Sequence, residues 1–148
     1  MKLAIKQPLI IGDTGIKGEQ GVCALYPFKN SDGEYLCRIV LGLRPEEYLK
    51  KYGRVNLCNE TWSVKEARKR AIEIMFERRR LLILLGAKVC KAFGIRYEAF
   101  SVVYIAGIQV VILPQARVKN PTWKTGTHSM AQRLIAMCDA RAERDSVK

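Results

Sequence analysis

Short apolar runs recur along the chain between polar and glycine-containing segments, and this spacing predicts strands that alternate with helices. The run Leu81–Leu85 shows no polar alternation, which is typical of a central parallel strand buried on both faces. Two later runs flank Ala106-Gly107 and predict a hairpin whose second arm is a core strand that ends at Pro114. The predicted strands and hairpin arms are residues 8–11, 54–58, 81–85, 100–105 and 108–113.

Apolar residues at helical spacing predict helices between these strands. Ser63 and Glu66 have the spacing of a capping box, so the clearest helix is expected to begin at Ser63. Its apolar stripe is predicted to be Val64, Ala67, Ala71, Ile72 and Met75. The last helix is expected from Thr127 to about Arg144, with an apolar face of Met130, Leu134, Met137 and Cys138. Further helices are predicted over residues 31–42, 44–50 and 87–93.

The alternation of strands and helices predicts an α/β fold, a three-layer sandwich with a mainly parallel four-stranded sheet and helices on both faces. The length of 148 residues suits a single domain over 1–148, and no internal repeat or linker divides the chain. In such sheets, ligands bind outside the carboxyl ends of the strands. These ends are expected at residues 12–15, 56–59, 86 and 114–120.

The charge balance points to an anionic partner. Lysine and arginine number 26 against 14 aspartate and glutamate residues, so the formal net charge is +12, while 49% hydrophobic residues still allow a proper core. A basic folded domain favours nucleic acid over an anionic membrane as its partner, although a solvated basic surface is the simpler alternative. The segment Arg78–Arg80 is equally suited to DNA contact and to the negative end of a helix dipole.

Several classes of protein are disfavoured. The apolar runs are much shorter than the roughly 20 residues of a membrane-spanning helix, and residues 1–7 lack signal-peptide features, so we expect a cytoplasmic protein without a membrane partner. Five cysteines without a Cys-x-x-Cys pair indicate reduced, mostly buried thiols and neither metal nor cofactor. His128, at a predicted helix start, favours a capping or surface role over catalysis.

Polar residues at the predicted strand ends form short segments in a recognisable order. They are Ile10–Gly15, Tyr26–Phe28, Val55–Leu57, Leu82–Ala87 with Phe93-Gly94, and Leu113–Trp123. In content and order these segments resemble motifs of the uracil-DNA glycosylase superfamily over nearly the whole chain. The resemblance implies a monomeric, metal-free enzyme that flips an altered base out of DNA and hydrolyses its N-glycosidic bond.

The resemblance also implies roles for individual residues. Asp13 and Gln115 become the catalytic pair: Asp13 orients water and stabilises the cationic sugar, and Gln115 donates to the leaving base from a position where the family usually has histidine or asparagine. In base binding, Phe28 stacks on the flipped base and Asn56 reads its edge, with Asn59 as the fallback. Ile16 occupies the position where some branches of the family exclude thymine.

The last segment is similar to the family's loop that enters the minor groove. Its predicted DNA-binding residues are Arg117, Val118, Lys119, Asn120, Trp123 and Lys124. Lys119 lies at the wedge position, the cations suit phosphate contact, and Val118 or Trp123 is the possible intercalator. Lys17 and Lys29 are expected to add positive charge at the same edge.

Two alternatives to a glycosylase stay open. The first is a nucleic-acid-binding protein that keeps the fold and the basic face but has weak or no catalysis because Gln115 is a neutral amide. The second is a nucleotide- or anion-binding regulator that uses the glycine-rich segment Gly12–Gly21 as a phosphate nest, although the segment lacks a Walker lysine-serine signature.

Overall fold

The fold is built around one mixed sheet of five strands in the order β2-β1-β3-β5-β4. A computed structural model describes residues 7–15, 23–116 and 122–146. The strands are β1 (Leu9–Thr14), β2 (Gly53–Cys58), β3 (Leu81–Leu85), β4 (Ser101–Ile105) and β5 (Ile108–Leu113). The first three and β5 are parallel to one another, and β4 pairs antiparallel with β5 at the edge.

The predicted α/β class is confirmed, but the sheet has one strand more than expected. The additional strand is β4, the first arm of the predicted hairpin, which pairs with β5 along its whole length from Ser101↔Ile112 to Ile105↔Ile108. A two-residue turn joins the arms, with φ of 49° at Ala106 and 83° at Gly107. Because such a tight turn returns the chain beside the strand it joins, the first arm completes the sheet as an antiparallel edge strand.

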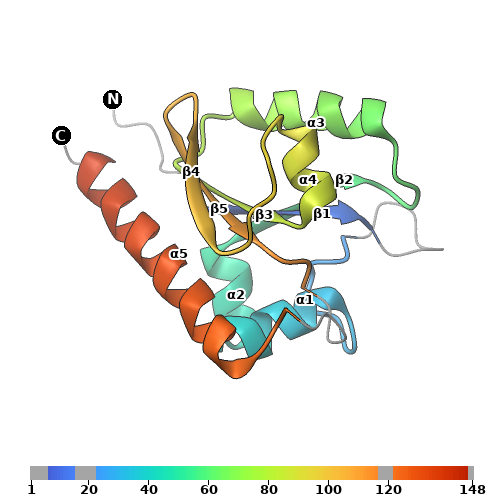
Figure 1. Ribbon diagram of the computed structural model, residues 1–148. Helices are drawn as coiled ribbons and strands as arrows, with labels where there is room; N and C mark the ends of the chain where they lie inside the picture. Colours follow the sequence, from blue (N-terminus) through green and yellow to red (C-terminus); the bar gives the residue numbers. More distant parts are fainter. Residues whose placement is uncertain (1–6, 16–22, 117–121, 147–148) are drawn as a thin grey trace.

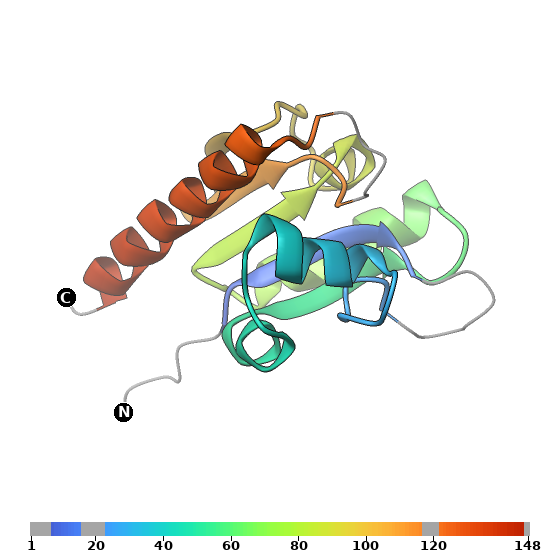
Figure 2. The ribbon, with the colours of Figure 1, turned by 90° about the horizontal axis from the view of Figure 1, so that it is seen from below.

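Helices cover both faces of the sheet, as Figure 1 shows. They are α1 (Asp32–Glu34), the π-helix η1 (Tyr35–Val40), α2 (Pro45–Lys51), α3 (Val64–Phe76), α4 (Ala87–Ala92) and α5 (Thr125–Ser146). The helices α3 and α4 lie on one face, and the others lie on the opposite face. Seen from below in Figure 2, α5 runs along the β3 and β5 half of its face, while η1 and α2 cover the half nearer β1. This arrangement is the predicted three-layer sandwich.

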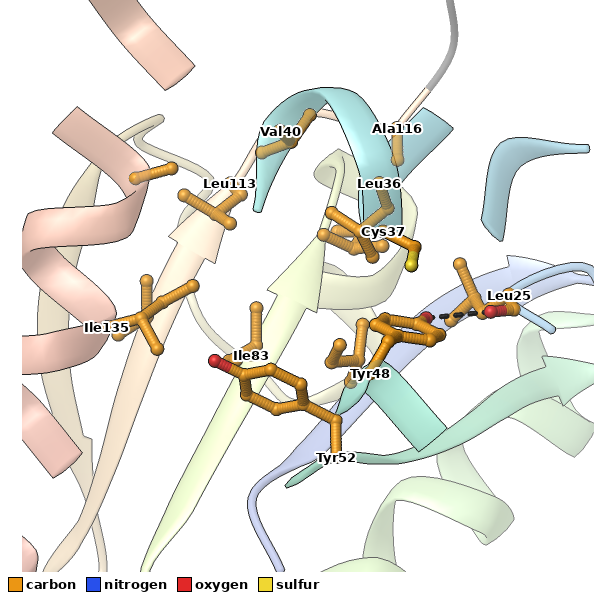
Figure 3. Packing of buried hydrophobic residues seen from close by; sticks show 14 of the residues in the cluster. Leu25, Leu36, Cys37, Val40, Tyr48, Tyr52, Ile83, Leu113, Ala116 and Ile135 are labelled. Atoms are coloured by element: carbon orange, nitrogen blue, oxygen red, sulfur yellow. Dashed lines mark hydrogen bonds between the residues drawn. The ribbon is translucent and has the colours of Figure 1, made fainter. Parts of the chain in front are cut away.

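One of the two cores contains Tyr48 of α2, whose side chain is completely buried. Its hydroxyl donates a 2.7 Å hydrogen bond to the main-chain oxygen of Leu25, and Figure 3 shows this bond among the packed apolar side chains. A buried hydroxyl without an acceptor is costly, so this bond favours one position for the segment that precedes α1. The bond thereby joins the core on this face of the sheet to Leu25, in the segment that follows β1.

The buried face of α3 differs from the predicted stripe. Ala67, Ala71 and Ile74 are buried against the sheet, whereas Ile72 is 59% exposed and Val64 is also exposed. The small side chains at Ala67 and Ala71 allow the helix to approach the sheet closely, and this places the larger Ile72 outside the contact. The prediction that Val64 and Ile72 belong to the core was therefore wrong.

The buried face of α5 also differs from the predicted one. Its buried residues are Ala131, Ile135 and Cys138, whereas Met130 and Met137 are exposed. Gln109 on β5, itself buried, donates through its Nε2 to the main-chain oxygen of Cys138 over 3.0 Å. The predicted face was correct for Cys138 and wrong for the two methionines, because apolar spacing alone fits two neighbouring stripes of this helix.

The arginines between α3 and β3 make structural contacts. Arg79 donates through Nη1 to the main-chain oxygen of Gln7 over 2.7 Å, and Arg80 lies 3.8 Å from the Asp139 carboxylate on α5. Arg78 has a φ of 55° where the chain leaves α3. All three lie at the amino end of β3, opposite the edge where ligands bind in such sheets. Among the described helices, none has the length and apolar character needed to span a membrane.

The buried phenol of Tyr52 makes stability sensitive to alkaline pH. Burial raises the pKa of Tyr52 to about 12, against an ordinary value of 10.0. The neutral phenol therefore contributes stability that is complete below pH 10 and is lost as the pH rises toward about 12, which amounts to roughly 2–3 kcal/mol. Chemical unfolding from pH 8 to pH 12 should show this loss. In Tyr52→Phe the slope over that range should be smaller, and an unchanged slope would contradict the assignment.

Candidate functional site

The carboxyl ends of β1, β2 and β3 and the end of β5 meet at one edge of the sheet. Ile11 pairs with Leu84 in β3, Leu84 pairs with Ile112 in β5, and Gly12 pairs with Asn56 in β2. The strand order reverses between β1 and β3, which is the topological switch point where open α/β sheets bind ligands. A small cavity of about 10 Å³ lies there. It is lined by Gly12, Asp13, Thr14, Ala24, Leu25, Asp32, Asn56, Leu85, Gln115 and Ala116.

Asp13 and Gln115, the two predicted catalytic residues, are in direct contact across this cavity. The Gln115 Nε2 donates a 2.6 Å hydrogen bond to Oδ2 of Asp13, although the residues are 102 positions apart. The other carboxylate oxygen, Oδ1, accepts from the main-chain N–H of Thr14 over 2.7 Å. Both side chains are partly buried, so a carboxylate and an amide donor face the same small volume in a partly desolvated setting.

Gly86, directly after β3, leaves the space that Gln115 occupies. A Cβ atom at this position would lie 2.6 Å from Cγ of Gln115, and the φ of +93° disfavours any residue with a side chain. The main-chain N–H of Gly86 donates to the oxygen of Leu113 over 2.8 Å, so the end of β3 also holds the end of β5. Gly86, at the predicted strand end, thus makes room for Gln115, which lines the cavity.

Asn56 lines the cavity and also holds the segment that follows β1. Its Oδ1 accepts a 2.8 Å hydrogen bond from the main-chain N–H of Ala24. A Cβ atom on Gly12 would lie 2.8 Å from Nδ2 of Asn56, so the strand β1 needs glycine at this point for the asparagine to lie across it. The prediction that Asn56 belongs to the site is consistent with this position. Its amide oxygen, however, already accepts a hydrogen bond from the main chain.

Asn59, the fallback for Asn56, lies outside this cavity. It is exposed, and its main-chain oxygen accepts from the N–H of Gly15. It lines a separate polar cavity of about 670 Å³ together with Glu60, Thr61, Glu66, Arg70 and residues 56–58. Because Asn56 borders both cavities, it is the residue of β2 that connects the small cavity with the larger one.

Phe28, the predicted base-stacking ring, is not among the residues that line the small cavity. Its side chain is 43% exposed, and its ring centroid lies 4.5 Å from that of Tyr26 at an interplanar angle of 41°. The guanidinium of Arg54 lies 5.8 Å from the centroid of Tyr26. The aromatic pair is therefore a surface feature of the same connecting segment, and the structure does not bring Phe28 together with Asp13 and Gln115.

Trp123, predicted as a possible intercalator, has a buried indole with 7% exposure. Its Nε1–H donates a 2.7 Å hydrogen bond to the main-chain oxygen of Gln115. His128 packs against the indole at 5.5 Å, and its Nε2 lies 3.1 Å from the hydroxyl of Tyr35. Trp123 and His128 thus fix the backbone of the catalytic candidate Gln115. Neither periodicity nor spacing signalled this role, because neither pattern reports the hydrogen bond between Trp123 and Gln115 within the connection from β5 to α5.

Most of the predicted DNA-binding loop lies outside the described residues. This applies to Arg117, Val118, Lys119 and Asn120, and likewise to Ile16 and Lys17. Lys124, at the start of the last helix, is exposed, as is Lys29 beside Phe28. The described residues of this loop therefore contribute one exposed cation, Lys124, and one buried structural residue, Trp123.

The cysteines are free thiols and mostly buried, as predicted. Cys37, Cys58, Cys90 and Cys138 are buried, and Cys23 is half-buried. Burial raises the pKa of Cys90 to about 11, which keeps its thiol protonated near neutral pH. Within the described part of the chain, no three side chains of histidine, cysteine, aspartate or glutamate gather to hold a metal ion.

Comparison with known proteins adds no identification. No protein-family model matches the sequence, and no curated protein shows significant similarity to it. The resemblance to the uracil-DNA glycosylase superfamily therefore depends on the short segments at the strand ends. The site itself is defined by the contacts of Asp13, Asn56 and Gln115 described above.

The close approach of Gly12 and Asn56 predicts a measurable coupling. Gly12→Ala should displace the Asn56 amide, break its bond to Ala24 N–H, and lower the free energy of unfolding by about 1–2 kcal/mol. In an Asn56→Ala background the same substitution should cost about 1 kcal/mol less. Chemical denaturation of the two single variants and the double variant gives this coupling energy. Additive effects would show that the two residues act independently.

Proposed function

We propose that this protein is a DNA glycosylase, a compact relative of the uracil-DNA glycosylase superfamily that hydrolyses the N-glycosidic bond of uracil or another altered base. The observation that carries the proposal is the pair of Asp13 and Gln115, hydrogen-bonded over 2.6 Å where β1 and β5 end. This cleavage needs a negative group near the sugar, which becomes positive, and a hydrogen-bond donor near the base, which becomes negative. The Asp13 carboxylate and the Gln115 amide supply one of each.

The chemistry assigns a separate task to each residue. The bond between the base nitrogen and the sugar C1′ breaks, and the base leaves with the electron pair. The Asp13 carboxylate stabilises the positive charge on the sugar and accepts a proton from the water whose oxygen adds to C1′. The Gln115 amide donates a hydrogen bond to the base oxygen that becomes negative, and the released base then takes up a proton.

Substrate binding must change the contact seen in the structure. Gln115 now donates to Asp13, so its amide has to exchange this acceptor for the base. The small cavity has room for about one water molecule and not for a base. Base entry therefore requires the Asp13–Gln115 contact to open toward the larger polar cavity, whose 670 Å³ is within the usual range for a ligand and which shares Asn56 as a wall.

Charge supports DNA as the substrate. The chain carries a net charge of +12, and a protein that neutralises phosphates with lysine and arginine gains affinity by releasing counterions. Lys29 and Lys124 are exposed near the site edge. In this proposal the cations of residues 117–124 contact phosphates, and Trp123 supports the loop from beneath instead of entering the DNA.

Substitutions at the catalytic pair test the proposal directly. With a uracil-containing oligonucleotide and a readout of alkali-labile abasic sites, Asp13→Asn should lower the cleavage rate by about 10²–10³. Glu98→Gln, which also neutralises a carboxylate but on the exposed segment before β4, should keep the parent rate. Equal rates for Asp13→Asn and the parent protein would contradict the assignment of Asp13.

A gain of function tests Gln115. Gln115→His supplies the side chain that the family usually has at this position, and it should raise the cleavage rate by about tenfold or more if the neutral amide limits catalysis. The same assay on Gln115→Ala should show a loss. If neither the parent protein nor Gln115→His releases any altered base, while duplex DNA still binds with strong salt dependence, the protein is a binding module that has lost catalysis.

A further inference from the structure

A third cavity lies at the opposite edge of the sheet, away from Asp13 and Gln115. It has a volume of about 440 Å³ and lies between α3, α4 and the β4–β5 turn. Its described lining residues are Ala71, Ile72, Met75, Phe76, Arg78, Ala92, Phe93 and Ala106. Phe76, the last residue of α3, is 82% exposed, although phenylalanine is a residue that folding usually buries. The lining of this cavity is thus mostly apolar and partly exposed.

Packing within the chain does not account for the exposed residues. The helix α3 buries Ala67, Ala71 and Ile74, whereas Ile72 and Phe76 lie one turn apart on a neighbouring stripe. A single exposed apolar residue is ordinary, but two at this spacing beside a cavity lined by Met75 and Phe93 form a groove suited to apolar side chains from outside.

The same stripe is basic toward the start of α3. Lys65, Lys69, Ile72 and Phe76 follow one another at spacings of four, three and four residues, so all four lie along one side of the helix. Arg68 lies beside them, and α4 contributes Lys88 and Lys91. All of these cations are exposed, and none forms an ion pair with a residue of the described chain. The exposed side of α3 that borders the groove therefore passes from an apolar end into a positively charged end.

The acidic residues of this region are directed elsewhere. Glu73 pairs with Arg70 over 3.4 Å on the other side of α3, and Glu77 pairs with Arg79 over 3.5 Å. Glu66 lines the polar cavity with Arg70. The groove consequently presents apolar groups and positive charge with few acidic groups of its own, which is complementary to an acidic surface that carries apolar side chains.

We propose that this groove between α3 and α4 is a docking site for an acidic, amphipathic helical segment of a partner protein. Two apolar side chains of the segment, one turn apart, enter the cavity beside Phe76, and its acidic residues face Lys65, Arg68 and Lys69. A second copy of this chain is disfavoured because its own net charge is +12. Nucleic acid offers anions but not the hydrocarbon side chains that an apolar cavity buries.

The docking site does not depend on the glycosylase proposal. Phe76 and Arg78 precede the amino end of β3, whereas Asp13 is the last residue but one of β1 and Gln115 follows the carboxyl end of β5. The apolar end of the groove therefore lies away from the Asp13–Gln115 pair. Loss of base cleavage in Asp13→Asn has no bearing on peptide binding, and loss of peptide binding has no bearing on base cleavage.

The test uses the full chain and a displayed library of short helical peptides with two leucines one turn apart and glutamate or aspartate at the outward positions. Enriched peptides are labelled and titrated by fluorescence anisotropy. Phe76→Ser and Arg68→Glu should each weaken binding by at least about tenfold, because one removes the apolar contact and the other reverses a charge. Matched substitutions on the opposite face, Ile39→Ser and Arg38→Glu, should change the affinity by no more than about twofold.

Three results would overturn the proposal. They are a library that yields no enriched peptide, equal binding of a peptide whose leucines are replaced by alanine, and equal affinity of Phe76→Ser and Ile39→Ser for the enriched peptides. Binding of a duplex oligonucleotide that is lost in Phe76→Ser but kept in Ile39→Ser would instead assign the groove to nucleic acid. Circular dichroism of each variant shows that it is folded, which separates lost contacts from lost structure.

Discussion

The hydrogen bonds that β3 makes to β1 on one side and to β5 on the other determine where the polar groups of the candidate site lie. All five residues of β3 are buried, and Leu84 pairs with both Ile11 and Ile112. This register places Asp13 two residues beyond one partner and Gln115 three residues beyond the other. A slip by one residue would turn apolar side chains of β1 or β5 from one core to the other, so the packing of both cores holds this register. The site therefore depends on the stability of the sheet itself.

The polar side chains at that edge can lie close to the backbone of neighbouring strands because glycines leave room for them. Gly12 admits the amide of Asn56, and Gly86 admits the side chain of Gln115. Trp123 and His128 then support Gln115 from the α5 side through the indole bond to its main-chain oxygen. Preorganisation of this kind matters for catalysis, because donors and acceptors that are already oriented cost little reorganisation when charge develops.

The two edges of the sheet have different chemistry. The carboxyl edge carries the carboxylate, amides and glycines of the candidate active site, and the amino edge carries the exposed apolar side chains at the end of α3, whose cations lie toward its start. The arginines Arg79 and Arg80 serve neither surface, because they bind Gln7 and Asp139 within the fold. A high net positive charge is therefore distributed over structural contacts, the predicted DNA-binding edge and the groove between α3 and α4. Its total value alone does not locate a binding surface.

Local pattern by itself determined the strands, most helices, the α/β class and the edge at which Asp13, Asn56 and Gln115 meet, because alternating apolar runs and strand-end residues are local signals. It did not determine which stripe of α3 or α5 is buried, since apolar spacing fits two neighbouring stripes and only contact with the sheet selects one. It did not show that the Trp123 indole binds the main-chain oxygen of Gln115 within the same connection, and it placed Phe28 in the site although Phe28 does not line the cavity. Tertiary structure decided these points because each depends on which side chains pack inside the fold and which stay exposed, and local spacing does not fix that.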